Sequence, residues 1–386
     1  MSRFHLDRIG SMTREELENI NIDPPDRRLQ QSIKEIWDGI AKPLDGLGEF
    51  EGIISRIGAM TGTAQIDLSR KAVIVMCADN GIVEEGVSQS GQEVTAVVAS
   101  NLVKGAASVC KMAKKAGADL FPVDIGINRE DVIPGLLRHK IAPGTKNFRK
   151  EPAMSEKEAL KAIGIGICIA SECAARGYQI LATGEMGIGN TTTSSAMAAA
   201  MLPCEVEEIT GRGAGLSAGG LEHKCRVIRD SLDCYRLHHE ETLRILATVG
   251  GFDIAGLAGV FIGGAVNHIP VVIDGVISAV AALTAQRLVP GVRDYMIASH
   301  KSREPGAKKV LEELELHPVL DASLALGEGT GAVMMLSLLD TVLPVYQERT
   351  TFEDYRMEQY SRYQAKGQTA GNGSQVVSNR SVMEEA

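Results

Sequence analysis

Residues 178–201 read YQILATGEMGIGNTTTSSAMAAAM, and the architecture of the whole chain can be worked out from this stretch. It begins with an apolar run over 178–183 that is typical of a buried strand. It then passes through a loop rich in glycine and continues into an alanine-rich helix over 193–201. A strand that leads into a helix through a glycine-rich loop is the repeating unit of sheets whose strands run parallel.

The same alternation continues on both sides of this unit. Other short apolar runs predict strands over 72–78, 120–125, 206–210, 270–273 and 295–298. Between them, helices are predicted over 92–116, 155–176, 221–235, 240–268 with a break at Gly250 and Gly251, 276–288 and 305–314, and a last helix near 327–345 closes the unit. This order predicts an α/β fold, with a doubly wound, mostly parallel, Rossmann-like sheet.

The two ends of the chain differ from this pattern. Residues 1–70 are amphipathic, with capping-box spacing between Thr13 and Glu16 and a second predicted helix over 26–40. We expect a small helical domain from residues 1–70, completed by about 346–365, beside a catalytic domain over 71–345. Residues 366–386 are poor in hydrophobic side chains, and we expect them to form a disordered tail.

Composition and charge exclude several classes of protein. The chain has 386 residues and a net charge of −9, so we expect no binding to nucleic acid and none to a membrane surface. Its 7 cysteines form no CxxC pair, which indicates reduced thiols in the cytoplasm rather than disulfides or a zinc site. Residues 247–267 are apolar enough to resemble a membrane span, but Asp253 among them favours a buried helix.

The loop within 184–193 is the strongest candidate for binding an anion. Closely spaced glycines let backbone N–H groups approach a ligand, and the start of the following helix adds a positive dipole. A second segment, GRGAG at 211–215, is followed by Lys224. Neither segment has the GKS or GKT of a P-loop or the GxGxxG of a dinucleotide site. The candidate phosphate contacts are Gly187, Gly189, Asn190, Thr191, Thr192, Gly211, Gly213 and Lys224.

Carboxylates and other polar groups follow several of the predicted strands. Glu185 stands in the first loop, and Glu328 stands between two glycines in LGEGTG at 326–331. Such a carboxylate either faces a ligand as a general base or only begins a helix. Because the carboxyl ends of parallel strands meet at one edge of a sheet, further candidates for this site are Asp79, Ser88, Gln92, Asp274 and Ser299. Asp253 and His300 should lie on the same face, but a lone histidine such as His300 is more often structural than catalytic. The sequence has no HExxH and no Cys–His ligand spacing, so we expect no metal.

Together these motifs resemble the nicotinate-nucleotide–dimethylbenzimidazole phosphoribosyltransferase (CobT) family of cobalamin biosynthesis. The stretches that carry the resemblance are KPLDGLGEFE, VMCADNGIVEEGVS, PVDIGI, GEMGIGNTTT, VGGFDIAGLAGV, PVVIDG, IASHKSREPGA and LGEGTGA, in order from about residue 42 to 346. The resemblance covers the whole of the predicted α/β unit. It implies a dimer, formed either by two copies of the chain or with a paralogue.

The resemblance also implies a reaction. The phosphoribosyl group of nicotinate mononucleotide moves to a nitrogen of 5,6-dimethylbenzimidazole, which yields α-ribazole 5′-phosphate and nicotinate. Glu328 would be the general base, and Glu185 would be a second carboxylate beside the ribose. The segments 187–192 and 211–213 and Lys224 would hold the phosphate. Ser88, Gln92 and Leu326 would lie near the aromatic base, and no metal ion or organic cofactor is implied.

The sequence departs from the family pattern at three places. Asn80 stands where the family's ADHG segment has a histidine, KPLDGLG replaces KPPGSLG, and residues 214–222 are less polar than in the family. The change at Asn80 leaves the acceptor base open, so a phenol or p-cresol ribosyltransferase is an alternative. A non-catalytic subunit of a heterodimer is another. A dinucleotide-dependent oxidoreductase, suggested by composition alone, is disfavoured because GxGxxG is absent.

Overall fold

The computed structural model describes residues 12–362, and its centre is a six-stranded sheet in the order β3-β2-β1-β4-β5-β6. All of the pairings within it are parallel. The strands are β1 (Lys71–Ala78), β2 (Ala118–Gly126), β3 (Leu137–Arg138), β4 (Ile180–Met186), β5 (Val271–Ile273) and β6 (Met296–Ala298). The predicted α/β fold with a doubly wound parallel sheet is confirmed.

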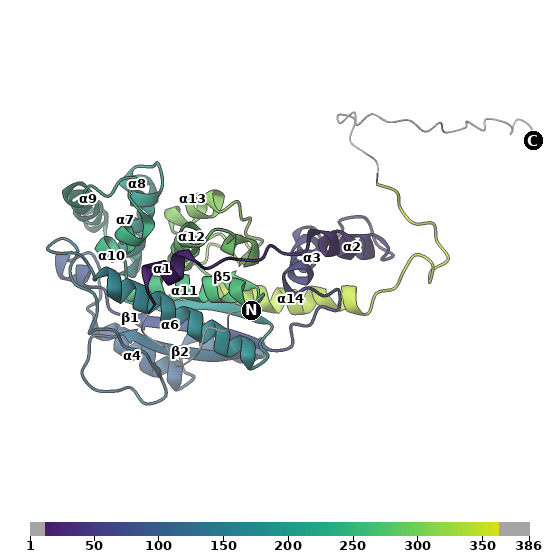
Figure 1. Ribbon diagram of the computed structural model, residues 1–386, viewed down its shortest axis with the longest axis horizontal. Helices are drawn as coiled ribbons and strands as arrows, with labels where there is room; N and C mark the ends of the chain where they lie inside the picture. The colour runs from purple at the N-terminus through teal and green to yellow at the C-terminus, as the bar shows by residue number, and fades with distance from the viewer. Residues whose placement is uncertain (1–11, 363–386) are drawn as a thin grey trace, which may run out of the picture.

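Helices cover both faces of this sheet (Figure 1). Successive side chains of a strand point to opposite faces, so Ile74 and Met76 of β1 enter one core and Val73 and Val75 enter the other. The first core also contains residues of α6 (Glu156–Ala175), α7 (Asn190–Met201), α8 (Val206–Ile209), α9 (Ala218–Tyr235), α10 (Thr242–Val249), α11 (Phe252–Val266), α12 (Val276–Leu288) and α13 (Pro305–Glu313). The second contains residues of α2 (Arg27–Asp38), α3 (Glu49–Thr61), α4 (Glu93–Val103), α5 (Ser108–Lys115) and α14 (Thr330–Gln347).

The apolar segment 247–267 lies inside the fold as the end of α10 and the whole of α11. The two helices are separated at Gly250 and Gly251, as predicted. Helix α11 packs closely on α6, because a Cβ added at Gly259 would lie only 2.0 Å from the carbonyl oxygen of Ile163. Among the described residues, no helix is both long enough and apolar enough to span a bilayer.

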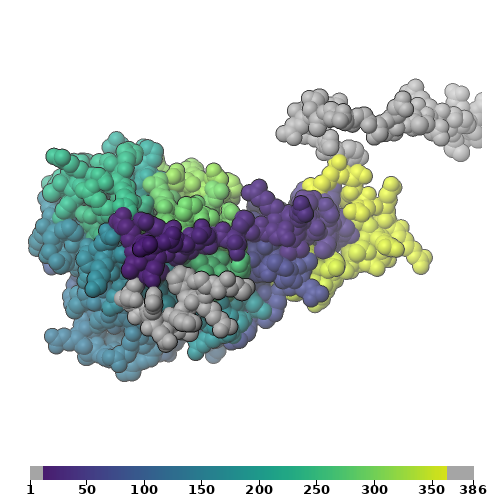
Figure 2. Space-filling model, in the orientation of Figure 1, coloured from purple at the N-terminus to yellow at the C-terminus, as the bar shows by residue number. Residues whose placement is uncertain are grey.

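Helical segments from the two ends of the described chain lie beside each other (Figures 1 and 2). The rings of Trp37 in α2 and Tyr346 in α14 are 5.2 Å apart, and α3 contributes Ile54 and Ile57 to the same core. The predicted capping box at Thr13 begins α1 (Arg14–Glu18). The predicted tail at 366–386 lies outside the described residues.

Two sequence predictions were wrong in detail, and one strand was not predicted. The strand expected at 206–210 is the helix α8, because Val206 and Ile209 are buried at helical spacing while the two glutamates between them are exposed. The sixth strand is instead β3, a pair of exposed residues at the sheet edge. The single helix expected at 92–116 is divided into α4 and α5 near Gly105, whose φ is +71°. Two short 3₁₀ helices, η2 (Gly81–Glu85) and η3 (Val292–Tyr295), complete the elements.

Candidate active site

The strand order brings the carboxyl ends of β1 and β4 side by side where the chain changes direction through the sheet. From β1 the chain passes to β2 and β3 on one side, and it then returns to β4 on the other. Parallel sheets of this kind bind ligands in the crevice outside these strand ends. A cavity of about 190 Å³ lies beyond the ends of β4, β5 and β6. Its lining includes eight of the sequence-predicted site residues: Glu185, Gly187, Asn190, Thr191, Gly213, Asp274, Leu326 and Glu328.

Glu185 is a buried carboxyl group on the wall of this cavity. It stands near the end of β4, so it belongs to the strand rather than to the predicted loop. Its carboxyl group accepts a hydrogen bond from the amide of Asn190, which also donates to Asp253 at 3.0 Å. The pKa of Glu185 is raised to about 8, chiefly by burial; the Asn190 bond opposes this rise, and the neighbouring charge of Asp253 adds to it. Burial likewise raises the pKa of Asp253, to about 6.

Two further carboxyl groups at the cavity contact helix N-termini. Asp274 follows β5 and accepts backbone hydrogen bonds from Gly329, Gly331 and Ala332, at 3.1, 2.8 and 3.0 Å, at the start of α14. Burial raises the pKa of this aspartate. Glu328 accepts from the backbone N–H of Val109, at 3.3 Å, in the first turn of α5. The cavity wall therefore combines two carboxyl groups that accept from backbone N–H groups at helix starts with Glu185, which accepts from a side-chain amide.

The backbone at Glu328 is held in an unusual conformation. Glu328 has φ +60°, in the left-handed region that costs a non-glycine residue energy, and it lies between two glycines with φ +83° and +96°. The loop also presses against β4, since a Cβ added at Gly184 would lie 2.4 Å from the carbonyl oxygen of Glu328. The structure therefore places Glu185 and Glu328, the two glutamates that the sequence indicated, at one cavity. They stand on two segments that are distant in sequence and in contact in space.

A positively charged side chain lies behind the other end of the cavity. Lys224 of α9 is fully buried, and its Nζ donates to Thr191 Oγ1 at 3.0 Å and to the carbonyl of Gly211 at 3.1 Å. Burial lowers the pKa of Lys224 to about 8, against the opposing influence of Glu304. Within residues 12–362 no carboxylate forms an ion pair with this lysine. A buried cation beside a helix N-terminus can hold an anion such as a phosphate.

Eight predicted residues do not line the cavity. Lys224 and Gly211 lie behind Thr191, as described, and Thr192 is buried inside α7. Gly189 is the N-cap of that helix. Ser299 donates to the carbonyl of Asp274 at 3.3 Å. The other three follow β1: Asp79 accepts from the backbone N–H of Asn128, Gln92 donates to the carbonyl of Asn80, and Ser88 accepts from the N–H of Ser90.

Asn80, the position that departs from the family pattern, is also away from the cavity. Its side chain is 1% exposed and accepts a hydrogen bond from Thr193 Oγ1 at 3.0 Å. It stands next to Asp253, and its amide helps to hold the pKa of that carboxyl down against burial. The departure thus changes a buried polar network beneath the site.

Several lining residues were not among the predicted site residues. Ser302 and Glu304 come from the loop after β6, and Val276 and Ile277 begin α12. His300 also lines the cavity, where its Nδ1 is 2.9 Å from Ser299 Oγ and burial lowers its pKa. His300 was weighed as a candidate from its position after a strand. Ser302 and Glu304 could not be predicted, because nothing in their sequence spacing shows that the loop after β6 returns to the cavity.

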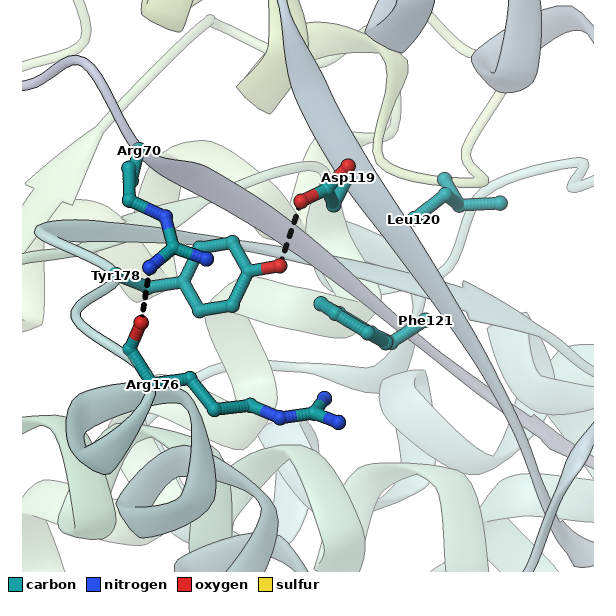
Figure 3. A pocket seen from close by; sticks show the side chains of 6 residues that line it. All are labelled: Arg70, Asp119, Leu120, Phe121, Arg176 and Tyr178. Carbon is teal, nitrogen blue, oxygen red and sulfur yellow. Dashed lines mark hydrogen bonds between the residues drawn. The ribbon is translucent and has the colours of Figure 1, made fainter.

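A second depression, of about 530 Å³, lies near the opposite ends of the strands (Figure 3). The hydroxyl of Tyr178 donates to Asp119 at 2.6 Å, and Arg70 lies over the tyrosine ring, 4.8 Å from its centre. Arg176 lies over the ring of Phe121, at 6.0 Å. Tyr178 therefore contacts both Asp119 and Arg70 within this depression.

One cluster of carboxylates has a spacing that could hold a metal ion. It comprises Asp38, Asp45 and Glu51, far along the chain from the cavity residues. Lysine and arginine side chains already pair with these carboxylates: Lys42 with Glu51 at 2.7 Å, and Arg362 with both aspartates at 2.7 and 2.8 Å. The cluster is therefore neutralised by the protein itself.

Comparison with known proteins assigns the chain to a family. The phosphoribosyltransferase family profile matches residues 22–356. A nicotinate-nucleotide–dimethylbenzimidazole phosphoribosyltransferase of Acetivibrio thermocellus is 45% identical over 84% of this chain and 92% of its own length. The enzyme of the same name from Geobacter sp. is 43% identical over 86% of this chain and 96% of its own.

The solved structures agree with this assignment. The crystal structure of CobT from Thermus thermophilus superposes with a TM-score of 0.81 and 38% sequence identity, covering 86% of this chain and 100% of that one. Sequence and fold thus match over the same, nearly complete length. The chain belongs to the nicotinate-nucleotide–dimethylbenzimidazole phosphoribosyltransferase family.

Proposed function

We propose that this protein transfers the phosphoribosyl group of nicotinate mononucleotide to a nitrogen of 5,6-dimethylbenzimidazole, in cobalamin biosynthesis. The products are α-ribazole 5′-phosphate and nicotinate. One observation carries the proposal: Glu185 and Glu328 share a cavity with the N-terminal turn of α7, behind which Lys224 is buried. The names of relatives more than 40% identical to this chain support the same reaction.

The 5′-phosphate binds at the end of the cavity formed by Thr191 and Gly213. Backbone N–H groups at the start of α7 and the charge of Lys224 attract it, although Lys224 acts from behind Thr191. Glu304 lines the same end, so its carboxylate turns away from the phosphate when the nucleotide binds. The ribose then lies toward Glu185, and the aromatic base lies toward Glu328 and the exposed side chain of Leu326.

The chemistry needs one general base and no general acid. Nicotinate leaves through its pyridine nitrogen, which takes the electron pair of the glycosidic bond and departs without needing a proton. The acceptor attacks with one ring nitrogen from the opposite face, so the anomeric carbon inverts from β to α. The other ring nitrogen loses its proton to Glu328, which the left-handed loop holds at the cavity. The ribose lies toward Glu185, whose ionised form, predominant above its pKa of about 8, stabilises the positive charge that develops there.

A phenol is the second candidate acceptor. It attacks through oxygen and must also lose a proton, so Glu328 would serve in the same way. The buried position of Asn80 favours dimethylbenzimidazole, because the departure at this residue does not alter the cavity wall. We further propose that the protein acts as a homodimer. Light scattering of the purified chain tests this, and a monomer inactive until a paralogue is added would favour the non-catalytic subunit instead.

A competition assay tests the proposed reaction and its acceptor together. The purified chain is incubated with nicotinate mononucleotide and equal amounts of dimethylbenzimidazole, phenol, p-cresol and adenine, and each ribotide is measured by mass spectrometry. We expect the benzimidazole ribotide as the main product, with an equal amount of nicotinate. Phenolic ribotides would support the second candidate. A folded protein that forms no ribotide would contradict both.

A further inference from the structure

Asp253 lies directly behind the cavity wall without forming part of it. It stands in the first turn of α11, is 0% exposed, and accepts a hydrogen bond from the backbone N–H of Ile254 at 3.0 Å. Its carboxylate is closely packed, since a Cβ added at Gly251 would lie 2.4 Å from Oδ1 and one added at Gly187 would lie 2.9 Å from Oδ2. The reaction proposed above gives this residue no part.

The amide of Asn190 connects Asp253 to the cavity. An asparagine NH₂ group has two hydrogens, and here its acceptors are Glu185 Oε2 on the cavity side and Asp253 Oδ2 on the buried side. With a carboxylate on each side, the nitrogen faces both, and the amide oxygen must point elsewhere. If Asp253 were absent, the amide could turn and present its oxygen to Glu185, which would repel the ionised carboxyl.

We propose that Asp253 is a positioning residue of this active site: through Asn190 it fixes the amide that holds Glu185, and the two carboxyl groups share one proton. The proposal rests on the function proposed above. Two buried carboxyl groups bridged by one neutral amide do not both ionise readily, because each negative charge disfavours the other. The pair therefore titrates as a unit.

The surroundings of the pair are consistent with this sharing. The titratable groups that face Glu185 are Asp253, Asp274 and Glu328, with the thiol of Cys77 from β1 on the buried side. Asp274 and Glu328 each have backbone N–H donors at a helix start. In the described part of the chain, Glu185 has only the Asn190 amide. Burial is the main cause that raises its pKa, and the charge of Asp253 adds to the rise.

Two substitutions move the ionisation of Glu185 in opposite directions. Asp253→Asn removes the neighbouring charge but keeps an oxygen that can accept from the Asn190 amide, so the amide stays in place and the pKa of Glu185 falls. Asn190→Ser removes the amide donor and raises that pKa. A residue that only supports the fold would not produce opposite shifts. Asp119→Asn removes a carboxylate near the other end of the sheet and serves as the control.

The experiment measures kcat/KM for the transfer between pH 5.5 and 9.5, roughly the range over which the pair titrates. The pH profile of kcat/KM has one limb that reports the ionisation of Glu185, and this limb is the one that is missing in Glu185→Gln. We expect its midpoint to move down by about one pH unit in Asp253→Asn, up in Asn190→Ser, and not at all in the control. A limb that stays in place in Asp253→Asn, or moves up, overturns the proposal.

Thermal unfolding of the same four variants across the same pH range gives a readout that needs no activity. Wild-type Tm should fall more steeply with rising pH than that of Asp253→Asn, because the wild type must give up a shared proton. If the wild type shows no phosphoribosyl transfer but the two Tm slopes differ, the proposed function is wrong, and the proposal that Glu185 and Asp253 share a proton is still supported. Equal slopes would refute the sharing. If Asp253→Asn does not fold, the midpoint of the kcat/KM limb in Asn190→Ser decides instead: an upward shift supports the proposal, and no shift overturns it.

Discussion

Replacing Lys224 with methionine should make the free protein slightly more stable while weakening its hold on the nucleotide. Burial lowers the pKa of Lys224 from 10.5 to about 8, and at about 1.4 kcal/mol per pKa unit this means that holding the charge inside the fold costs ~3 kcal/mol near pH 7. Methionine has a similar length and no charge. The substitution also removes the donor to Thr191 Oγ1 and Gly211 O, a loss of ~1 kcal/mol for each bond.

The net effect on the free protein is therefore a gain of ~1 kcal/mol, or about 1–2 °C in Tm for a chain of this size. The stability difference between Lys224→Met and the wild type depends on pH. The cost of the buried charge is present below the folded pKa, about 8, and it disappears as pH rises above the unfolded pKa. The advantage of Lys224→Met over the wild type should thus vanish in alkaline solution.

Binding should change in the other direction. Lys224 acts on the phosphate from behind Thr191, and a buried opposite charge that does not touch the phosphate contributes ~1.5–3 kcal/mol at an effective dielectric constant of about 20, so the Kd for nicotinate mononucleotide should rise by about 10- to 150-fold. Differential scanning fluorimetry measures the first effect and isothermal titration calorimetry the second. Lys157→Met, at an exposed position on α6, is the matched control and should change neither. A variant that is less stable than the wild type and binds the nucleotide as tightly would refute the assignment of Lys224 to the phosphate.

The remaining predictions concern the carboxylates and the loop that carries one of them. Glu328→Gln should lower kcat by about 100-fold or more while nicotinate mononucleotide still binds, as single-turnover kinetics and calorimetry can show; retained turnover would exclude the general-base role. Gly184→Ala should lower kcat in steady-state assays, because its Cβ would lie 2.4 Å from the carbonyl oxygen of Glu328, whereas Gly219→Ala, with no atom within 4 Å, should not; equal activities would show that the loop position is unimportant. The folded pKa values of Glu185 and Asp253, about 8 and about 6, lie above those of free carboxyls, so the folded protein binds more protons. The free energy of unfolding from urea titrations should therefore fall as pH rises through this range, less steeply in Glu185→Gln, and a flat profile would contradict the burial of these groups.

Sequence reasoning predicted the sheet because its central strands are buried on both faces. Runs such as 72–78 are short and apolar at every position, which is typical of a strand covered on both sides. β3 gave no such signal, because it has two exposed residues at an edge. Val206 and Ile209 were misread as strand because four residues are too few to distinguish a helical period from a strand run.

The candidate site was predictable where its residues follow strands directly. Glu185 and Asp274 could be placed at one edge of the sheet as soon as the strands were known to be parallel. Glu304 could not, because it reaches the cavity from a loop whose path depends on tertiary contacts. Ser88 and Gln92 were expected near the base, but their hydrogen bonds are to the segments that follow β1 and β2, away from the cavity of this chain.

The proposed reaction forms an α-configured ribotide and releases nicotinate in equal amount. The most direct measurement incubates the purified protein with nicotinate mononucleotide and dimethylbenzimidazole and follows the anomeric proton by NMR, with Glu328→Gln as the blank. We predict α-ribazole 5′-phosphate with the inverted anomeric centre, in the wild-type sample only. A β-configured product, or an unchanged nucleotide in the presence of folded protein, would contradict the account.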